Sequence, residues 1–188
     1  VTGFSQQTFS TRYLGFPLYI GRCKVAYFVE VCQKVLGKIV SWKTKFLSSG
    51  GRITLIKHVL SAIPDHLLSA AVIPTAVFRA IERACADFLW GASEEGSRYH
   101  WIGWSKLCLP PEERGVGFRL LSDLYTAFSY KLWWQFRTGS SLWVSFMRAK
   151  YCRGIHPCQA ECKPSASATW KRMLDLSRQV ELSMPWLV

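Results

Sequence analysis

The strongest periodic pattern in the chain predicts a long amphipathic helix near its N-terminal end. From Val25 to Phe46, apolar residues recur at spacings of three and four, as on a helix that packs one face against a core. On the opposite face, Lys34, Lys38 and Lys45 fall within about 40° of one another on a helical wheel. These lysines form a basic line that either stays solvated or follows a phosphate backbone.

Two further helices follow the same spacing rule. Residues 48–52 read as a breaker with a serine cap, after which apolar positions from Ile53 to Ile63 predict a helix that Pro64 ends. We expect this helix and the first one to form an αα-hairpin. Apolar residues from Val77 to Leu89 predict a third helix, which stops at Gly91.

The remaining segments predict shorter elements. Residues 11–20 surround Gly15 and Pro17 with aromatic and branched residues, which favours a short hairpin, and residues 91–117 read as a loop region with a strand over 99–102. Residues 120–138 are apolar on nearly every face, so this helix is expected to be buried or covered by a neighbour missing from the chain. After it we expect a helix over 142–151, a linker over 152–168 and a short helix over 170–176.

Together these patterns predict a mainly α fold, a helical bundle with a short N-terminal β-hairpin and an irregular Trp-rich loop region in the middle. The expected segments are a hairpin over 1–22, a helical segment over 23–91, a loop region over 92–119 and a C-terminal helical segment over 120–188. The longest uncharged stretch, 67–78, is too short to cross a bilayer, so no membrane partner is predicted.

The net charge of the chain is the main indication of its binding partner. The chain has 24 Lys and Arg against 12 Asp and Glu, a net charge of +12, and a field of that sign favours polyanions such as nucleic acid or acidic membrane. Seven cysteines without regular disulfide spacing, and no recognisable leader, predict an intracellular setting, either nuclear or cytoplasmic.

Candidate chemistry is sparse. Polymerase catalysis needs paired carboxylates that hold two metal ions, and the sequence contains no Asp-Asp or Asp-x-Asp pair. No obvious carboxylate or nucleophile accompanies any of the four histidines, which are His58, His66, His100 and His156. We therefore predict no catalytic residue and no cofactor in this chain.

One cluster has metal-ligand residue types: Cys152, His156, Cys158 and Cys162. Its spacings are not those of common zinc knuckles or ribbons, and Pro157 stiffens its middle. Free thiols in a loop are the favoured interpretation, with a zinc site as the alternative. No metal site is predicted.

A series of short motifs gives the chain a family resemblance. They are Tyr13–Leu18, Leu47–Lys57, Phe88–Trp90, His100–Trp104, Gly115–Arg119, Lys131–Trp134, Lys150–Cys152 and Ser167–Lys171. In this order they resemble the post-palm thumb and C-terminal segment of plant non-LTR (LINE-type) retrotransposon reverse transcriptases. The chain departs from that pattern at 110–114, where the family tends to carry Lys and Gly, and at Tyr125, where it carries Asn.

The resemblance implies a role in gripping rather than in chemistry. Tyr13, Leu14 and Gly15 would form a primer grip, and the helices after them a thumb. The catalytic motif of the RNA-directed DNA polymerase, with its magnesium, would lie upstream of Val1. Both ends of the chain are expected to lie inside a longer protein, so the missing palm and C-terminal domains would be its partners.

The expected function is that of a non-catalytic, nucleic-acid-gripping fragment of the reverse transcriptase. It would bind RNA or an RNA–DNA duplex weakly and without sequence specificity, because phosphate contacts position a duplex without reading its bases. The binding residues would be Lys34, Lys38, Lys45, Arg52 and Lys57. The alternatives are a decayed open reading frame with no function, and a helical module that binds a protein through the face of 120–138.

Overall fold

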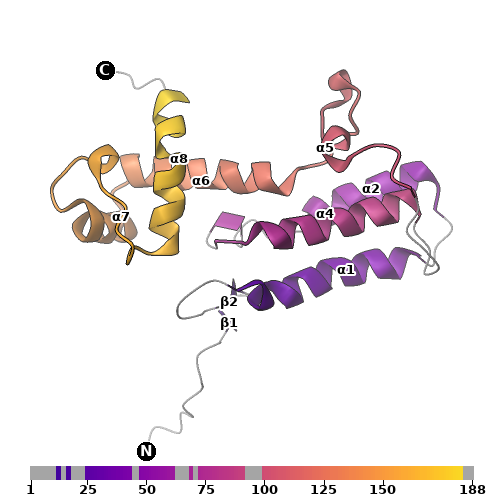
Figure 1. Cartoon of the computed structure of the whole chain (residues 1–188), viewed down its shortest axis with the longest axis horizontal. Helices are drawn as coiled ribbons and strands as arrows, with labels where there is room; N and C mark the ends of the chain where they lie inside the picture. The colour runs from indigo at the N-terminus through magenta and orange to yellow at the C-terminus, as the bar shows by residue number, and fades with distance from the viewer. Residues whose placement is uncertain are drawn as a thin grey trace, which may run out of the picture. The chain divides into compact units, whose positions relative to one another are not determined.

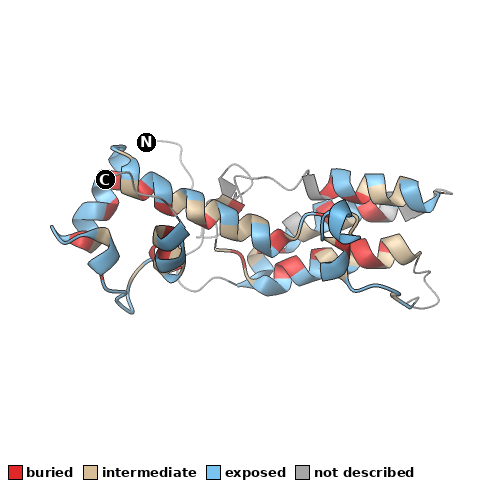
Figure 2. Ribbon diagram, turned by 90° about the horizontal axis from the view of Figure 1, so that it is seen from above, coloured by how far each residue is buried: buried red, intermediate tan, exposed pale blue. Residues whose placement is uncertain are grey.

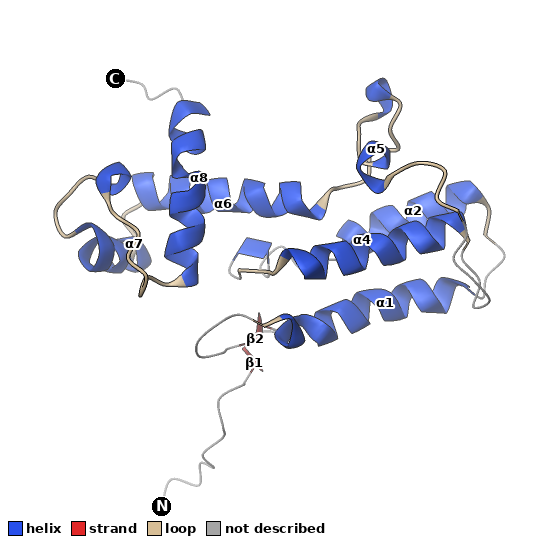
Figure 3. Cartoon of the chain, in the orientation of Figure 1, coloured by secondary structure: helices blue, strands red, loops and turns tan. Residues whose placement is uncertain are grey.

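The computed structural model of the 188-residue chain describes residues 12–13, 16–17, 24–43, 47–61, 68–69, 72–91 and 99–183. Helices make up most of the described residues (Figure 3), which confirms the mainly α class predicted from the sequence. The chain divides into two compact units. Unit 1 consists of the described residues within 1–67 and 73–122, and unit 2 of those within 68–72 and 123–188.

Unit 1 is built around helices that contact one another through apolar faces. A short 3-10 turn, η1 (Val25–Phe28), leads into α1 (Val29–Lys43), which contacts α2 (Ser49–Ser61) and α4 (Thr75–Trp90). These helices lie alongside one another in Figure 1, and Figure 2 marks the buried residues in red. The core of this bundle is formed by Phe28, Val35, Ile39, Ile56, Val59, Val77, Phe78, Ile81, Cys85 and Phe88.

The ends of two of these helices follow from local sequence. The Ser48 hydroxyl accepts a hydrogen bond from the Gly51 amide at 3.2 Å, which caps α2 as predicted. Gly50 and Gly51, which the sequence placed in a breaker before the helix, lie within the first turn of α2. The Ser48 cap holds this turn in helical form. At the other end of the bundle α4 stops at Gly91, whose φ of 70° is the left-handed conformation that glycine adopts most easily.

The prediction of a strand over residues 99–102 is wrong. Within the described part of the loop region, Tyr99 and Trp101 are each 78% exposed and pair with no other strand, and α5 (Trp104–Leu107) follows them. The backbone then reverses through a 3-10 turn, η2 (Pro111–Glu113), and is held by backbone hydrogen bonds from Val116 to Leu107 and from Gly117 to Leu109. This reversal brings buried Phe118 under Trp104, with stacked rings 5.1 Å apart.

At the N-terminal end, two short strands pair antiparallel. They are β1 (Arg12–Tyr13) and β2 (Phe16–Pro17), with Tyr13 opposite Phe16. Leu14 and Gly15, which were assigned to a primer grip, lie outside the described residues.

Unit 2 packs aromatic residues from several helices into one core. Its elements are α6 (Leu121–Thr138), whose first residues belong to unit 1, then α7 (Leu142–Met147), the π-helical turn η3 (Arg148–Cys152), η4 (Pro157–Gln159) and α8 (Ala168–Ser183). The Trp170 ring stacks on Tyr151 with centroids 4.6 Å apart and meets the Phe136 ring edge-on at 5.4 Å. Trp133, Phe136 and Trp170 are fully buried, so most of the apolar surface of α6 is used inside the chain.

The sequence predicted that the helix over 120–138 is buried or covered by a neighbour missing from the chain. In the structure, α8 packs against part of this helix. The α8 helix runs over Ala168–Ser183, well beyond the predicted 170–176, and crosses α6 in Figure 1. Hydrogen bonds join the two helices from Tyr130 to Gln179 and from Trp133 to Glu181. Trp134, on another face of α6, remains 42% exposed.

A buried arginine ties the parts of unit 2 together. Arg172 on α8 is 6% exposed and donates to the Ser129 hydroxyl at 2.6 Å, and to the backbone carbonyls of Leu68, Ser69 and Tyr125 at 2.8, 3.2 and 3.0 Å. Its guanidinium carbon also lies 3.8 Å from the centre of the Tyr125 ring, a cation–π contact. Burial lowers the pKa of this guanidinium.

Among the described residues, no helix combines the length and the apolar character needed to cross a membrane.

Candidate nucleic-acid interface

The exposed face of α1 carries two of the lysines that the sequence placed on one line. Lys34 and Lys38 are both exposed and one helical turn apart, and neither ammonium has a partner among the described side chains. The opposite face of the helix buries Val35 and Ile39. This amphipathic arrangement fixes the direction of both lysines toward solvent. Lys45 lies outside the described residues, so the full line of three stays a prediction.

Arg52 and Lys57, the other predicted contacts, are both on α2. Arg52 is half-buried, and its Nη1 donates to the Leu89 carbonyl at 3.2 Å, next to Gly91 at the end of α4. A cation at this position satisfies a carbonyl that the helix leaves open and complements the helix dipole. Lys57 is exposed, with its ammonium close to Gly117. The described contacts thus give Arg52 a structural role, and a phosphate contact by either residue stays a prediction.

A second basic surface of unit 1 surrounds an open pocket of about 720 Å³. We call it the α4 pocket, and its lining residues are Arg79, Glu82, Arg83, Ala86, Tyr99, His100 and Trp104. Arg79 and Arg83 are exposed on successive turns of α4, and no described residue pairs with either guanidinium. The Glu82 carboxylate accepts a hydrogen bond from the Leu121 amide at 3.1 Å.

His100 does have a carboxylate partner, contrary to the expectation from sequence. Its Nε2 lies 3.0 Å from Oδ1 of Asp87, and the two side chains are 33% and 29% exposed. The two residues lie thirteen positions apart in the chain, so sequence proximity alone does not reveal the contact. The pair fixes the imidazole ring at the edge of the α4 pocket.

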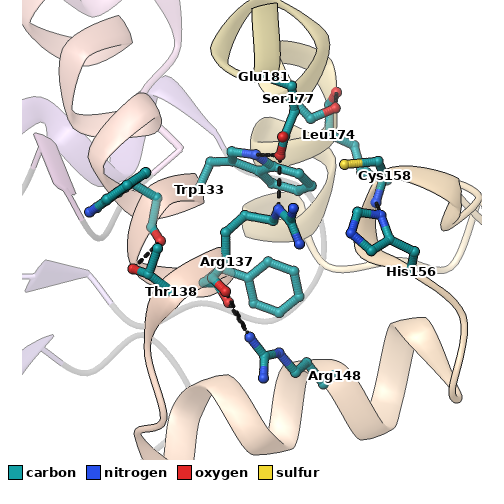
Figure 4. Close-up of polar contacts among 11 residues, drawn as sticks. Trp133, Arg137, Thr138, Arg148, His156, Cys158, Leu174, Ser177 and Glu181 are labelled. Atoms are coloured by element: carbon teal, nitrogen blue, oxygen red, sulfur yellow. Dashed lines mark hydrogen bonds and ion pairs between the residues drawn. The ribbon is translucent and has the colours of Figure 1, made fainter. Parts of the chain in front are cut away.

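The Cys and His cluster of unit 2 does not converge on one point. Cys152 is buried in the core, whereas Cys158 and Cys162 are exposed, and the Nδ1 atom of His156 accepts from the Cys158 amide at 3.4 Å. The Cys158 thiol interacts with the side chain of Glu181, and both residues are labelled in Figure 4. Across the described residues, no group of three or more His, Cys, Asp or Glu side chains is placed to hold a metal ion.

Glu181 is the centre of this polar region. Its Oε1 accepts from Trp133 Nε1 at 2.8 Å and from Arg137 Nε at 2.9 Å (Figure 4). Burial acts to raise the pKa of Glu181, but hydrogen bonds from Trp133 and Cys158 and the charge of Arg137 outweigh it, so the pKa is lowered. Burial and the hydrogen bond to Glu181 raise the pKa of the Cys158 thiol. These contacts serve the packing of α6 against α8.

Replacing Glu181 by glutamine is expected to reduce the pH dependence of stability. A carboxyl whose pKa is lowered on folding stabilises the protein above its unfolded pKa, near 4.5, and this contribution is lost as pH falls through the folded value. We expect Glu181→Gln to lower the free energy of unfolding by about 1–3 kcal/mol near neutral pH and by less in acid. Urea denaturation across that pH range measures this, with exposed Glu161→Gln as the control. An equal loss at every pH would contradict the assignment.

Comparison with known proteins gives one informative relative. The chain is 31% identical over 180 residues to a protein of Arabidopsis thaliana named for ribonuclease H. The match covers 91% of this chain but 28% of the relative, so the chain spans well under a third of that protein. No family model matches the chain, and no solved structure matches it.

This relative corrects the family assigned from motif order. The identification as a reverse transcriptase segment of a LINE-type retrotransposon is wrong, because the matching protein is named for a ribonuclease and not for an RNA-directed DNA polymerase. The primer-grip and thumb roles were drawn from that resemblance alone, and nothing in the described residues tests them. Short motifs rich in Trp, Gly and Leu carried the assignment, and such residues recur in helical cores for packing reasons alone. A plant source for the family agrees with the Arabidopsis match.

Proposed function

We propose that this chain is a helical nucleic-acid-binding segment of a ribonuclease H-type protein, and that it holds an RNA–DNA duplex by its phosphates through α1. The observation that supports this most is the pair of exposed lysines, Lys34 and Lys38, on one face of a helix whose other face is buried. Neither ammonium pairs with a described side chain. The net charge of +12 supplies an attractive field around them. The name of the relative makes RNA a ligand of that protein, and we extend this to the present chain.

Lysine suits this task because its ammonium is a mobile point charge that donates hydrogen bonds to phosphate oxygens in many directions. Contacts of this kind position a duplex and do not read its sequence. We therefore expect binding that is micromolar or weaker at physiological salt, with little preference for sequence. Lys45, which the helical wheel places on the same line, would add a third contact.

Hydrolysis would be the task of another part of the parent protein. Two-metal nucleases place carboxylates around paired metal ions, and the described residues contain no such group. We expect the isolated chain to leave an RNA–DNA duplex intact in magnesium. Cleavage of a labelled hybrid by purified chain above the level of a mock purification would contradict this.

The lysine pair is tested by a double variant. At low salt each lost phosphate contact reduces affinity about tenfold through counterion release, so Lys34→Gln/Lys38→Gln is expected to bind an RNA–DNA duplex about a hundredfold more weakly. The matched control is Lys131→Gln/Lys163→Gln, which removes the same charge from exposed positions of unit 2. Fluorescence anisotropy of a labelled duplex measures both. If the two double variants lost the same amount of affinity for the duplex, net charge alone would explain the loss, and a site on α1 would be contradicted.

A further inference from the structure

We infer that the α4 pocket binds an unpaired nucleotide of single-stranded nucleic acid, with the base held among its aromatic residues and the adjoining phosphates on Arg79 and Arg83. This inference rests on the proposed function, since it assigns a second contact within the same ligand class. The α4 pocket has a volume of about 720 Å³, which falls within the range of small-ligand sites, and it is lined by both charged and aromatic side chains.

The aromatic side of the pocket is exposed at a position where packing does not explain it. Tyr99 is 78% exposed, and its only ring neighbour among the described residues is Trp101, also 78% exposed, which it meets edge-on at 5.6 Å. Trp104 is held differently, because one face of its ring stacks on Phe118 at an interplanar angle of 10°. An open aromatic ring beside a fixed one provides surfaces on which a base of any type can stack.

The charged side of the pocket suits phosphate. Arg79 and Arg83 lie four residues apart on α4, which separates them by about 6 Å along the helix axis, so each can contact a different phosphate of one strand. Their guanidinium groups outnumber the one lining carboxylate, Glu82, which already accepts the Leu121 amide. The Asp87 carboxylate near the pocket edge is not a free anion, because the Nε2 atom of His100 contacts its Oδ1 at 3.0 Å.

The ligand is single-stranded because bases within a duplex are already stacked and cannot enter a pocket. The lysines on α1 can contact the phosphates of a duplex, whereas the α4 pocket requires a base that is neither paired nor stacked. The two sites of unit 1 therefore divide the ligand into a paired part and an unpaired part, such as a duplex with a single-stranded overhang.

Short single-stranded oligonucleotides of RNA and of DNA, each with an abasic counterpart, test the inference on the full chain. We expect Tyr99→Ala to weaken binding of the base-containing strands about tenfold to hundredfold, and to leave binding of the abasic strands and of a blunt duplex unchanged. Arg79→Gln/Arg83→Gln should weaken every single strand. The controls are Phe146→Ala, another exposed aromatic residue, and Arg153→Gln/Arg178→Gln at exposed positions that do not line the pocket.

The outcomes separate this inference from the proposed function. If the wild type binds base-containing and abasic strands equally, or if the pocket variants match their controls, the pocket is not a nucleotide site, even where Lys34→Gln/Lys38→Gln still weakens duplex binding. If the wild type binds neither strand nor duplex, both proposals fall. A difference between the RNA and DNA arms would show whether the sugar is contacted.

Discussion

Replacing Arg172 by methionine is expected to lower the free energy of unfolding of unit 2 by about 3–5 kcal/mol. The guanidinium donates to three backbone carbonyls and to the Ser129 hydroxyl, and methionine fills a similar volume without any donor. Carbonyl groups that lose their donor inside the protein bear the desolvation cost in full. The loss is large because one side chain serves three chain segments: 68–69, α6 and α8.

The effect is measured by chemical denaturation combined with hydrogen exchange of the α8 amides. Arg178→Met is the matched control, since Arg178 is exposed on the same helix and its loss should change stability by less than about 0.5 kcal/mol. A loss for Arg172→Met no larger than that of the control would show that the buried hydrogen bonds do not hold unit 2 together.

Replacing Gly115 by alanine is expected to destabilise unit 1 by about 3–5 kcal/mol. A Cβ atom at this position would overlap the Leu109 carbonyl oxygen and lie 2.7 Å from the Leu109 Cα, so the clash is with backbone that cannot rotate away. Relief requires the reversal between Leu107 and Phe118 to open, and both of those residues are buried anchors. The same opening would remove the stack of Trp104 on Phe118 beside the α4 pocket.

Gly103, twelve positions before Gly115, offers a matched control. Nothing lies within 4 Å of a Cβ built there, and its φ of −64° suits any residue. Gly103→Ala is therefore expected to leave the unfolding midpoint unchanged, while Gly115→Ala lowers it. If both variants melted like the wild type, the close approach of the chain at Gly115 would be disproved.

Helices could be predicted from the sequence wherever one face is buried and the other solvated. The period of α1 and α4 is visible in the sequence because Val35 and Ile39, or Val77 and Ile81, recur at helical spacing. The serine cap at Ser48 and the glycine stop at Gly91 depend on local chemistry, so they too could be anticipated.

The length of α8 and the region after residue 99 could not be predicted in this way. The buried positions of α8 include Arg172 and Ser177, polar residues that a hydrophobic pattern counts as exposed. Their burial depends on partners from distant segments, such as the carbonyls of Leu68 and Tyr125. Likewise, the aromatic residues near Tyr99 suggest a strand by propensity, but no neighbouring strand exists among the described residues to pair with them.

The candidate site likewise has one part that could be predicted from the sequence and one part that could not. Lys34 and Lys38 could be placed on one face because a helical wheel needs only sequence spacing. The α4 pocket joins Arg79 and Arg83 to Tyr99 and His100, which lie in a different segment of the chain. The one signal available for it was the concentration of Trp and Tyr between 99 and 104. Family motifs were less informative than this geometry, because they pointed to a polymerase and the relative is named for a ribonuclease.

The most direct test of the central claim is the salt dependence of binding between the wild-type chain and an RNA–DNA duplex. Contacts to phosphates by Lys34, Lys38 and Lys45 predict a slope of log affinity against log salt of about −2 to −3, and Lys34→Gln/Lys38→Gln should reduce its magnitude by nearly 2. A wild-type slope near zero, or the same slope in a folded double variant, would contradict the claim that α1 of this chain holds nucleic acid by its phosphates.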